Sequence, residues 1–204
     1  MLQQFSRYFS NALSPLLMPS YGVFLALWVS ILCYQSFATR ITVLIFIVGI
    51  TCVLPLFLFY ILQTIKIIPD TNLSDRKERI IPYAIATICY LIATYYLYRV
   101  HAPLWLLGFM IGVVSTSLVS FIINLKWKIS AHTAGLGGVV ALLFFLHHDH
   151  MEAFDSLWVL CFTIILAGII GSIRLYLQCH TLAQVLVGFA NGFLCVYFFI
   201  KLLY

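Results

Sequence analysis

Charged residues are scarce in this sequence: they make up 8% of its 204 residues, and only six of them are acidic. Soluble domains carry roughly 25% charged residues, whereas this chain is 64% hydrophobic with a mean hydropathy of +1.09. The low charge excludes an ordinary soluble domain. The lack of a basic patch reaching into water excludes nucleic acid as a partner. The sequence therefore predicts a single integral membrane domain over residues 1–204.

Cysteine pairs are also lacking, because none of the six cysteines belongs to a C-x-x-C motif. They fall inside or at the edges of apolar runs, which is typical of small buried side chains and argues against a disulfide framework or a cysteine zinc site. The layout of a cleavable signal peptide is missing too, since the first apolar run is long and leads directly into another.

Seven apolar runs dominate the sequence, each near the roughly 20 residues that cross a bilayer. Backbone groups in lipid must form hydrogen bonds internally, and alternating strand patterns are absent. We therefore predict an all-α, polytopic bundle of six or seven spanning helices. The runs are approximately 16–34, 41–63, 80–98, 103–125, 132–146, 157–177 and 181–203. Close helix packing is predicted at Gly108 and Gly112, Gly135 and Gly138, and Gly188 and Gly192.

The links between these runs alternate between the two membrane faces. One face receives the N-terminus and the links 64–79, 126–131 and 178–180. The other face receives Arg40 and the links 99–101 and 147–155. Three links that carry basic or histidine side chains are therefore expected to meet at the same membrane surface.

The first of these links contains a basic cluster, Arg76, Lys77 and Arg79. One helical turn would place Arg76 and Arg79 on the same face, and together the three side chains offer a dense set of donors for phosphate oxygens. The alternative is a solvated cluster that touches lipid headgroups.

The second link ends in Ser130 and His132, at the point where a helix is expected to begin. The serine hydroxyl and the first backbone amides of that helix can bind an anion beside the imidazole. A serine N-cap followed by an interfacial histidine explains the same pattern equally well.

The third segment contains Arg174, His180 and Gln184, and Arg174 is the only charged residue between Ser156 and Ile200. An ionisable side chain within a spanning run indicates a functional site. Histidine is a competent nucleophile or general acid near neutral pH, and Gln184 lies one helical turn later, where it can accept a hydrogen bond from the ring. Alternatively, Arg174 reaches the interface with its charged end and His180 caps the next helix.

The order of these three segments resembles the type-2 phosphatidic acid phosphatase superfamily of integral membrane enzymes, whose motifs are K-x6-R-P, P-S-G-H and S-R-x5-H-x3-D. The second motif corresponds to Ile129-Ser130-Ala131-His132, and the third begins at Ser172-Ile173-Arg174 and ends at Gln184. The resemblance covers roughly residues 66–184, and the spacing of the third motif is its most specific part.

The resemblance implies a metal-independent hydrolase, without a cofactor, that acts on a membrane lipid phosphate or pyrophosphate. It implies that His180 attacks phosphorus to form a phosphohistidine, that His132 protonates the leaving lipid alkoxide and that Gln184 orients His180. The implied partners are the phosphorylated lipid substrate and the surrounding membrane lipids. The phosphoryl oxygens would be held by Arg79, Arg76, Lys77, Ser130 and Arg174.

Five positions depart from the family pattern. In the first motif, Asn72 stands in place of lysine, and Pro82 lies two residues further from Arg79 than the motif requires. In the second and third motifs, Ala131 replaces glycine and Ile173 replaces serine. Gln184 replaces an aspartate, and it cannot stabilise an imidazolium by charge. A catalytically weak or inactive relative, which binds, transports or assembles lipid phosphates, is therefore the alternative function.

Two metal-dependent alternatives are less consistent with the sequence. The tract 147–150 reads His-His-Asp-His, but its members have no fixed ligand spacing, so a solvated loop on the opposite face is the favoured interpretation. A magnesium-dependent lipid transferase would need clustered carboxylates, and Asp70, Asp75 and Glu78 are interspersed with arginine and lysine.

The side of the membrane on which the motifs lie stays open. Eight of the 11 lysines and arginines are expected on the motif face and three on the other, so the positive-inside rule favours the cytoplasm, whereas the resemblance favours the outer face of a bacterial inner membrane. The eight are Arg7, Lys66, Arg76, Lys77, Arg79, Lys126, Lys128 and Arg174, and the three are Arg40, Arg99 and Lys201.

Overall fold

The computed structural model describes residues 4, 6, 8, 13–66 and 80–204, and its named elements are all helical within these ranges. This confirms the predicted all-α class. The elements are η1 (Pro15–Leu17), α2 (Met18–Val29), η2 (Ile31–Tyr34), α3 (Phe37–Val48), η3 (Gly49–Val53), α4 (Leu54–Thr64), α5 (Ile80–Arg99), α6 (Leu104–Lys126), α7 (Ala131–His148), α8 (Leu157–Tyr176) and α9 (Leu182–Leu203).

Six helices in the described part of the chain are long and apolar enough to cross a membrane, and α3, η3 and α4 together make the first of them. The first predicted run, 16–34, is interrupted and yields only a shorter apolar helix. The interruption lies at Ser30, whose backbone is extended. Its hydroxyl donates to the Ala26 carbonyl oxygen at 2.6 Å and accepts from the Leu32 amide at 3.1 Å, so the side chain ends α2 and begins η2.

The second predicted run forms one span with a π-helical segment, η3, in its middle. Pro55 lies just beyond this segment and has no amide to donate to the carbonyl of Thr51, four residues earlier, which disturbs the regular helix. The Thr51 hydroxyl instead donates to the Ile47 carbonyl oxygen at 2.8 Å and meets the Ser20 hydroxyl at 2.8 Å. The buried break therefore also joins this span to α2.

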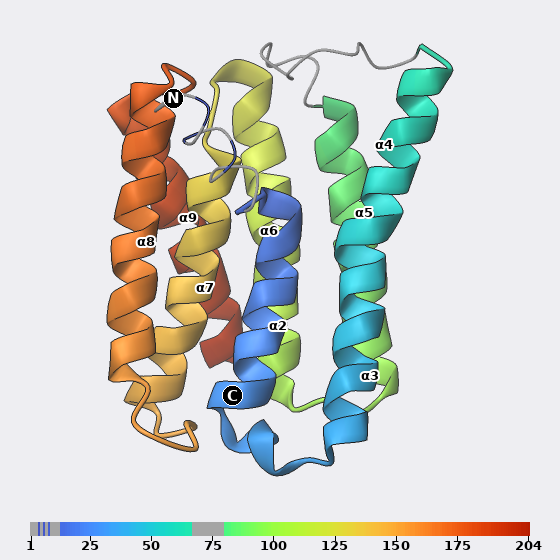
Figure 1. The fold of residues 1–204 in the computed structure, drawn as a ribbon, viewed down its shortest axis with the longest axis vertical. Coiled ribbons are helices and arrows are strands. Elements are labelled where there is room, and N and C mark those ends of the chain that lie inside the picture. The colour runs from blue at the N-terminus through green and yellow to red at the C-terminus, as the bar shows by residue number, and fades with distance from the viewer. Residues whose placement is uncertain (1–3, 5, 7, 9–12, 67–79) are drawn as a thin grey trace.

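The helices run along the long axis of the molecule, and consecutive long helices alternate in direction (Figure 1). The links 127–130 and 177–181, the C-terminal end of α4 and the N-terminal end of α5 lie together at one end, which we call the motif end. The links 30–36, 100–103 and 149–156 lie at the other end, which we call the opposite end. The predicted alternation of links between two faces is thus confirmed for the described residues.

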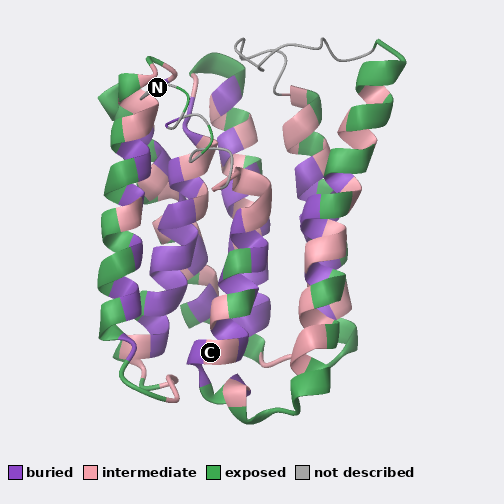
Figure 2. Ribbon diagram, in the orientation of Figure 1, coloured by how far each residue is buried: buried purple, intermediate pink, exposed green. Residues whose placement is uncertain are grey.

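The centre of the bundle is formed by α6, α7 and α9, and α7 is buried along most of its length (Figure 2). Glycines let these helices approach backbone to backbone. A Cβ on Gly108 would lie 2.6 Å from the carbonyl oxygen of Phe199, and one on Gly112 would lie 2.5 Å from the Cα of Val196. Close packing at the glycine pair of α6, predicted from spacing, is therefore confirmed.

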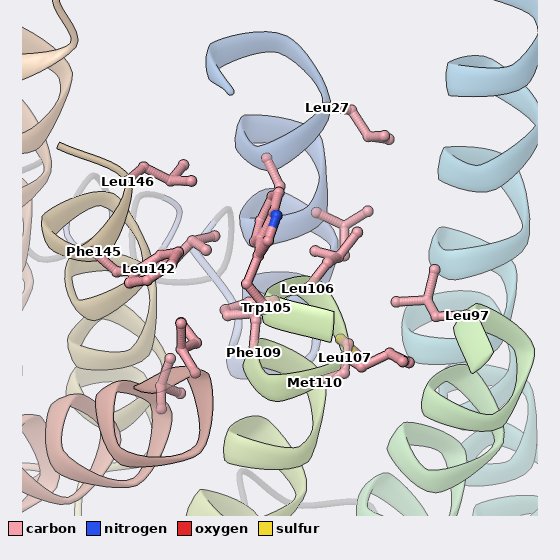
Figure 3. Close-up of a cluster of buried hydrophobic side chains, with 14 of the residues drawn as sticks. Leu27, Leu97, Trp105, Leu106, Leu107, Phe109, Met110, Leu142, Phe145 and Leu146 are labelled. Carbon is pink, nitrogen blue, oxygen red and sulfur yellow. The ribbon is translucent and has the colours of Figure 1, made fainter. Parts of the chain in front are cut away.

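The largest apolar cluster joins α2, α3, α5, α6, α7 and α9 (Figure 3). Trp105 and Phe109 of α6 lie at its centre, with Leu97 of α5 on one side and Phe145 of α7 on the other. These residues belong to the half of the bundle nearer the opposite end. The apolar core thus leaves the polar side chains of the motif end outside it.

Hydrogen bonds from polar side chains join the helices closer to the motif end. The hydroxyls of Thr87 on α5 and Ser117 on α6 lie 2.7 Å apart. The Asn191 amide on α9 donates to the Thr116 carbonyl oxygen at 3.1 Å and to the Ser120 hydroxyl at 3.0 Å. Such bonds contribute about 1 kcal/mol each within a membrane, and here they hold α5, α6 and α9 in register.

The link between α7 and α8 is held against the end of α2. The Ile31 amide donates to the Met151 carbonyl oxygen at 3.0 Å, and the Ala153 amide donates to the Val29 carbonyl oxygen at 2.9 Å. Burial raises the pKa of the Glu152 carboxyl in this link, but hydrogen bonds from Ser156 and His147 outweigh that effect and hold the pKa below its usual value. The link therefore has a defined conformation and an ionised carboxylate at neutral pH.

Candidate active site

The N-terminus of α7 is capped by Ser130, as its position before the helix predicts. Its backbone is extended and its hydroxyl accepts a hydrogen bond from the Thr133 amide at 3.5 Å, which satisfies one of the amides that a helix leaves open at its start. Ser130 is fully buried, and the next residue but one, His132, is partly exposed. The serine is thus a structural cap placed within one turn of the histidine.

Thr133 joins the start of α7 to the start of α9. Its hydroxyl lies 2.9 Å from the Val185 carbonyl oxygen and 3.2 Å from the Ser130 carbonyl oxygen. The Ser130 amide also donates to the Gln184 carbonyl oxygen at 3.3 Å. A Cβ on Gly188 would lie 2.6 Å from both the Ser130 carbonyl oxygen and the Thr133 hydroxyl. The second and third motif segments are therefore in direct contact.

The spacing between Arg174 and His180 has a local structural cause. The Cys179 and His180 amides both donate to the Arg174 carbonyl oxygen, at 3.1 and 3.4 Å, and the Gln178 amide donates to that of Leu175 at 2.9 Å. Gln178 has a positive φ of 52°. This is the Schellman arrangement that ends a helix, here without glycine. It reverses the chain within five residues and keeps His180 beside the last turn of α8.

The His180 ring is held by Gln184 in the first turn of α9. The Gln184 side-chain oxygen lies 3.1 Å from His180 Nδ1 and accepts from the Thr181 amide at 3.2 Å. The Thr181 hydroxyl in turn accepts from the Gln184 amide, which completes a capping box. Thr181, and not His180, is the cap of this helix.

This arrangement determines the tautomer of His180. Because the Thr181 amide can only donate, the Gln184 atom that it meets is the carbonyl oxygen, and this oxygen cannot donate to the ring. A neutral His180 therefore carries its hydrogen on Nδ1 and its lone pair on Nε2. His180 is buried, with 7% of its residue surface exposed, so the orientation of its ring is restricted. Gln184 thus holds the ring through a neutral side-chain oxygen.

The structure places the predicted site residues as follows. Ser130, His132, Arg174, His180 and Gln184 all lie at the motif end, on α7, α8, α9 and their links (Figure 1). The remaining predicted phosphate ligands, Arg76, Lys77 and Arg79, lie outside the described residues, although α5 begins at Ile80 at this same end.

Thr133 was not predicted from the sequence. Its position, one residue after His132 at the start of a predicted helix, was the only sequence feature that could have indicated a role. A threonine hydroxyl on a helix, however, more often forms a hydrogen bond within its own helix. Its partner Val185 is 52 residues away, and no sequence pattern relates the two positions.

An open hollow of about 530 Å³ runs along the outer face of α8. Its walls are mostly apolar, and it reaches from the middle of α8 to the last turn of the helix, where Arg174 also lies. The lining residues are Ser6, Ile165, Gly168, Ile169, Ser172, Ile173 and Tyr176.

The tract 147–150 lies at the opposite end, away from the motif segments, as predicted. Asp149 forms an ion pair with Lys201 at 2.6 Å, and His147 Nδ1 lies 3.1 Å from a carboxylate oxygen of Glu152. These side chains cannot take part in chemistry at the motif end.

Comparison with protein families gives a match that covers the segments just described. Residues 117–204 match the model of the PAP2 superfamily, the type-2 phosphatidic acid phosphatases. Searches of curated proteins and of solved structures give no match to the chain. The matched region extends from the middle of α6 to the end of α9 and contains both histidine motifs. The contact between the two histidine segments thus lies within residues 117–204, the region that matches the PAP2 superfamily model, in a chain whose described part has six membrane-spanning candidate helices, and the resemblance is confirmed there.

Proposed function

We propose that this protein is a phosphatase that removes phosphate from a membrane lipid phosphate or pyrophosphate through a phosphohistidine, without a metal ion. Membership of residues 117–204 in the PAP2 superfamily supports phosphatase activity. The observation that carries the proposal is the contact between the two histidine segments. It is a backbone hydrogen bond that the Ser130 amide donates to the main-chain carbonyl oxygen of Gln184 at 3.3 Å. This contact supports assigning the proposed general acid and the proposed nucleophile to one site.

His180 is the proposed nucleophile. With Nδ1 directed to Gln184, Nε2 attacks phosphorus in line with the leaving oxygen, so that the N–P bond forms as the P–O bond breaks. Protonated His132 donates its proton to the leaving lipid alkoxide. Water then attacks the phosphohistidine and transfers a proton to His132, which releases inorganic phosphate and restores both histidines.

Positive charge stabilises the phosphoryl oxygens in the transition state. Arg174 is the proposed ligand from the third segment, and the N-terminus of α7, beside Ser130, adds partial positive charge. Arg76, Lys77 and Arg79 are the proposed ligands from the link before α5. Positioning and charge stabilisation supply most of the catalysis in phosphoryl transfer, so no cofactor is required.

The location of the site favours a lipid substrate over a soluble phosphate ester. The histidine segments lie at the ends of apolar helices long enough to span a bilayer, at the level where lipid phosphates lie. The hollow along α8 leads from this end toward the middle of the span, and we propose that it receives an acyl chain. Helical spans fit the inner membrane of a bacterium, because proteins that span its outer membrane are β-barrels.

The function can be tested with purified protein and phosphatidic acid in mixed detergent micelles. We expect inorganic phosphate to be released at the same rate with and without EDTA, because the histidine mechanism uses no metal ion. Loss of activity in EDTA, with recovery on addition of Mg²⁺, would contradict the mechanism. Binding of phosphatidic acid without turnover would instead support the alternative of a lipid-phosphate binding or transport protein.

Because Gln184 is neutral, it cannot stabilise the positive charge that develops on His180, and we expect this to limit the rate of phosphate release. Gln184→Glu keeps the length of the side chain and an oxygen for both His180 and Thr181, and adds a negative charge beside the imidazole that becomes positive during turnover. We expect kcat to rise about tenfold, equivalent to roughly 1.4 kcal/mol of transition-state stabilisation. Steady-state phosphate release measures the effect.

Gln184→Met is the matched control, because it keeps the volume and removes both hydrogen bonds. We expect it to lower kcat, since His180 is no longer held in one orientation. If Gln184→Glu lost as much activity as Gln184→Met, the side-chain NH₂ group of Gln184, and not only its side-chain oxygen, would be required.

A further inference from the structure

The link between α7 and α8 concentrates metal-binding side chains that the proposed phosphatase reaction does not use. Residues 147–155 contain three of the six histidines and three of the six acidic residues of the chain. This link lies at the opposite end from the histidine motifs (Figure 1). Its composition therefore calls for an explanation separate from phosphate chemistry.

Three of these side chains converge. One potential ligand atom each from His147, Glu152 and Asp155 lies within 4.8 Å of the other two, and His147 Nδ1 is 3.1 Å from Glu152 Oε1. His147 comes from the last turn of α7, Glu152 from the link, and Asp155 from the residues just before α8. The convergence joins two helices, and of the tract 147–150 only His147 takes part.

The Glu152 carboxylate is oriented by contacts outside the cluster. Its Oε2 accepts from the amide of Ser156 at 3.1 Å and from the hydroxyl of the same residue. Ser156 is fully buried, so this contact fixes the carboxylate, whose Oε1 and Oε2 lie 3.1 and 3.3 Å from His147 Nδ1. Hydrogen bonds of this kind orient carboxylate ligands at metal sites.

The backbone of the link is fixed as well. Main-chain hydrogen bonds on both sides of Glu152, from the Ile31 amide to Met151 and from the Ala153 amide to Val29, tie the link to the end of α2. Lys201 of α9 holds Asp149, which leaves that carboxylate out of the cluster. A preformed backbone reduces the ordering that an ion would have to impose.

We propose that His147, Glu152 and Asp155 bind one Zn²⁺ ion at this end of the bundle. One imidazole nitrogen and two carboxylate oxygens are a normal zinc ligand set, and water takes the fourth tetrahedral position. Two carboxylates neutralise the charge of the ion. Mg²⁺ and Ca²⁺ prefer oxygen ligands throughout, so the imidazole selects against them. The site clamps the end of α7 to the start of α8 and is independent of the phosphatase reaction.

The competing explanation is local capping. Asp155 Oδ1 accepts from the Leu157 amide at 3.0 Å, and Glu152 bonds to Ser156, so both carboxylates also stabilise the start of α8. Capping requires oxygen acceptors at 152 and 155 and gives His147 only the role of a hydrogen-bond donor to Glu152, whereas zinc requires all three side chains as ligands. Substitutions can therefore separate the two explanations.

The test uses tag-free, full-length protein in detergent, stripped with EDTA and dialysed. Isothermal titration with Zn²⁺ and metal analysis after desalting should give one ion per chain, and the thermal unfolding temperature should rise with Zn²⁺ but not with Mg²⁺. His147→Ala should abolish retention of the ion. Asp155→Asn keeps an oxygen for the Leu157 amide and should weaken Zn²⁺ binding at least tenfold without lowering the unfolding temperature of the metal-free protein.

His148→Ala is the matched control, because this neighbouring histidine is outside the cluster and its side chain is 60% exposed; it should retain one ion. Zinc bound equally well by His147→Ala and Asp155→Asn, or not bound by the unaltered protein, would overturn the proposal. If His147→Ala does not fold, Asp155→Asn alone decides the outcome. Phosphate release is not a readout here, so failure of this site leaves the proposed phosphatase function untouched.

Discussion

His180→Ala is expected to lower kcat for phosphate release from phosphatidic acid by about 10⁴-fold or more, the range seen when a covalent nucleophile is removed. The contact between His180 Nδ1 and the Gln184 side-chain oxygen at 3.1 Å fixes the position of the attacking Nε2. Alanine has no atom at this position that could attack phosphorus. Single-turnover assays with radiolabelled phosphatidic acid measure the loss. They should also show that the acid-labile phosphoenzyme of the unaltered protein is absent from the variant.

His132→Ala separates the two histidine roles. Loss of a general acid costs about 10²–10⁴-fold, but p-nitrophenyl phosphate leaves as a stable anion that needs no proton. With this substrate the variant should still form the phosphoenzyme and release a burst of nitrophenolate, and then turn over slowly. His101→Ala, at the opposite end (Figure 1), is the control and should be fully active. Full activity of either His180→Ala or His132→Ala would refute the assignment.

Gly192→Ala is expected to destabilise the bundle by about 3 kcal/mol or more. A Cβ at this position would overlap the Ala134 carbonyl oxygen and would lie 2.7 Å from the Ala134 carbonyl carbon. These are backbone atoms of α7, so no side chain can move aside. Alanine is favoured over glycine in a helix by only about 1 kcal/mol, and the clash therefore decides the sign. Thermal unfolding in detergent, followed by intrinsic fluorescence, measures the change.

The same substitution should lower phosphate release, because α9 must move away from α7 close to the contact between Thr133 and Val185. Gly168→Ala is the stability control: nothing outside its own helix lies within 4 Å of a Cβ there, so its unfolding temperature should be unchanged or slightly higher. Equal unfolding temperatures for the two variants would show that α7 and α9 do not pack at the distance described.

Much of the local structure could be predicted from the sequence because its causes are local. Apolar runs of sufficient length form helices in lipid whatever their neighbours, and the alternation of links then brings the segments of Ser130 and His180 to one end. Ser130 was recognisable as a cap from its place before an apolar helix. The spacing from Arg174 to His180 likewise results from a single turn at the end of α8.

The contacts between helices could not be predicted in this way. The long helices are apolar on all sides, so periodicity does not distinguish a face that meets lipid from one that meets protein. The contact of Thr133 with Val185 and the meeting of His147 with Asp155 both depend on how neighbouring elements are rotated and joined. The interruption at Ser30 was missed because its cause is one serine side chain within an apolar run.

The amino-acid sequence by itself determined the class of protein, the ends at which its polar links lie and the identity of the two histidine motifs, since these follow from hydropathy, chain direction and residue type. Only the tertiary structure decided that α7 and α9 touch through glycine and threonine, and that the Gln184 oxygen holds the His180 ring. Both depend on close approach between backbones, which is governed by the rotation of each helix about its axis.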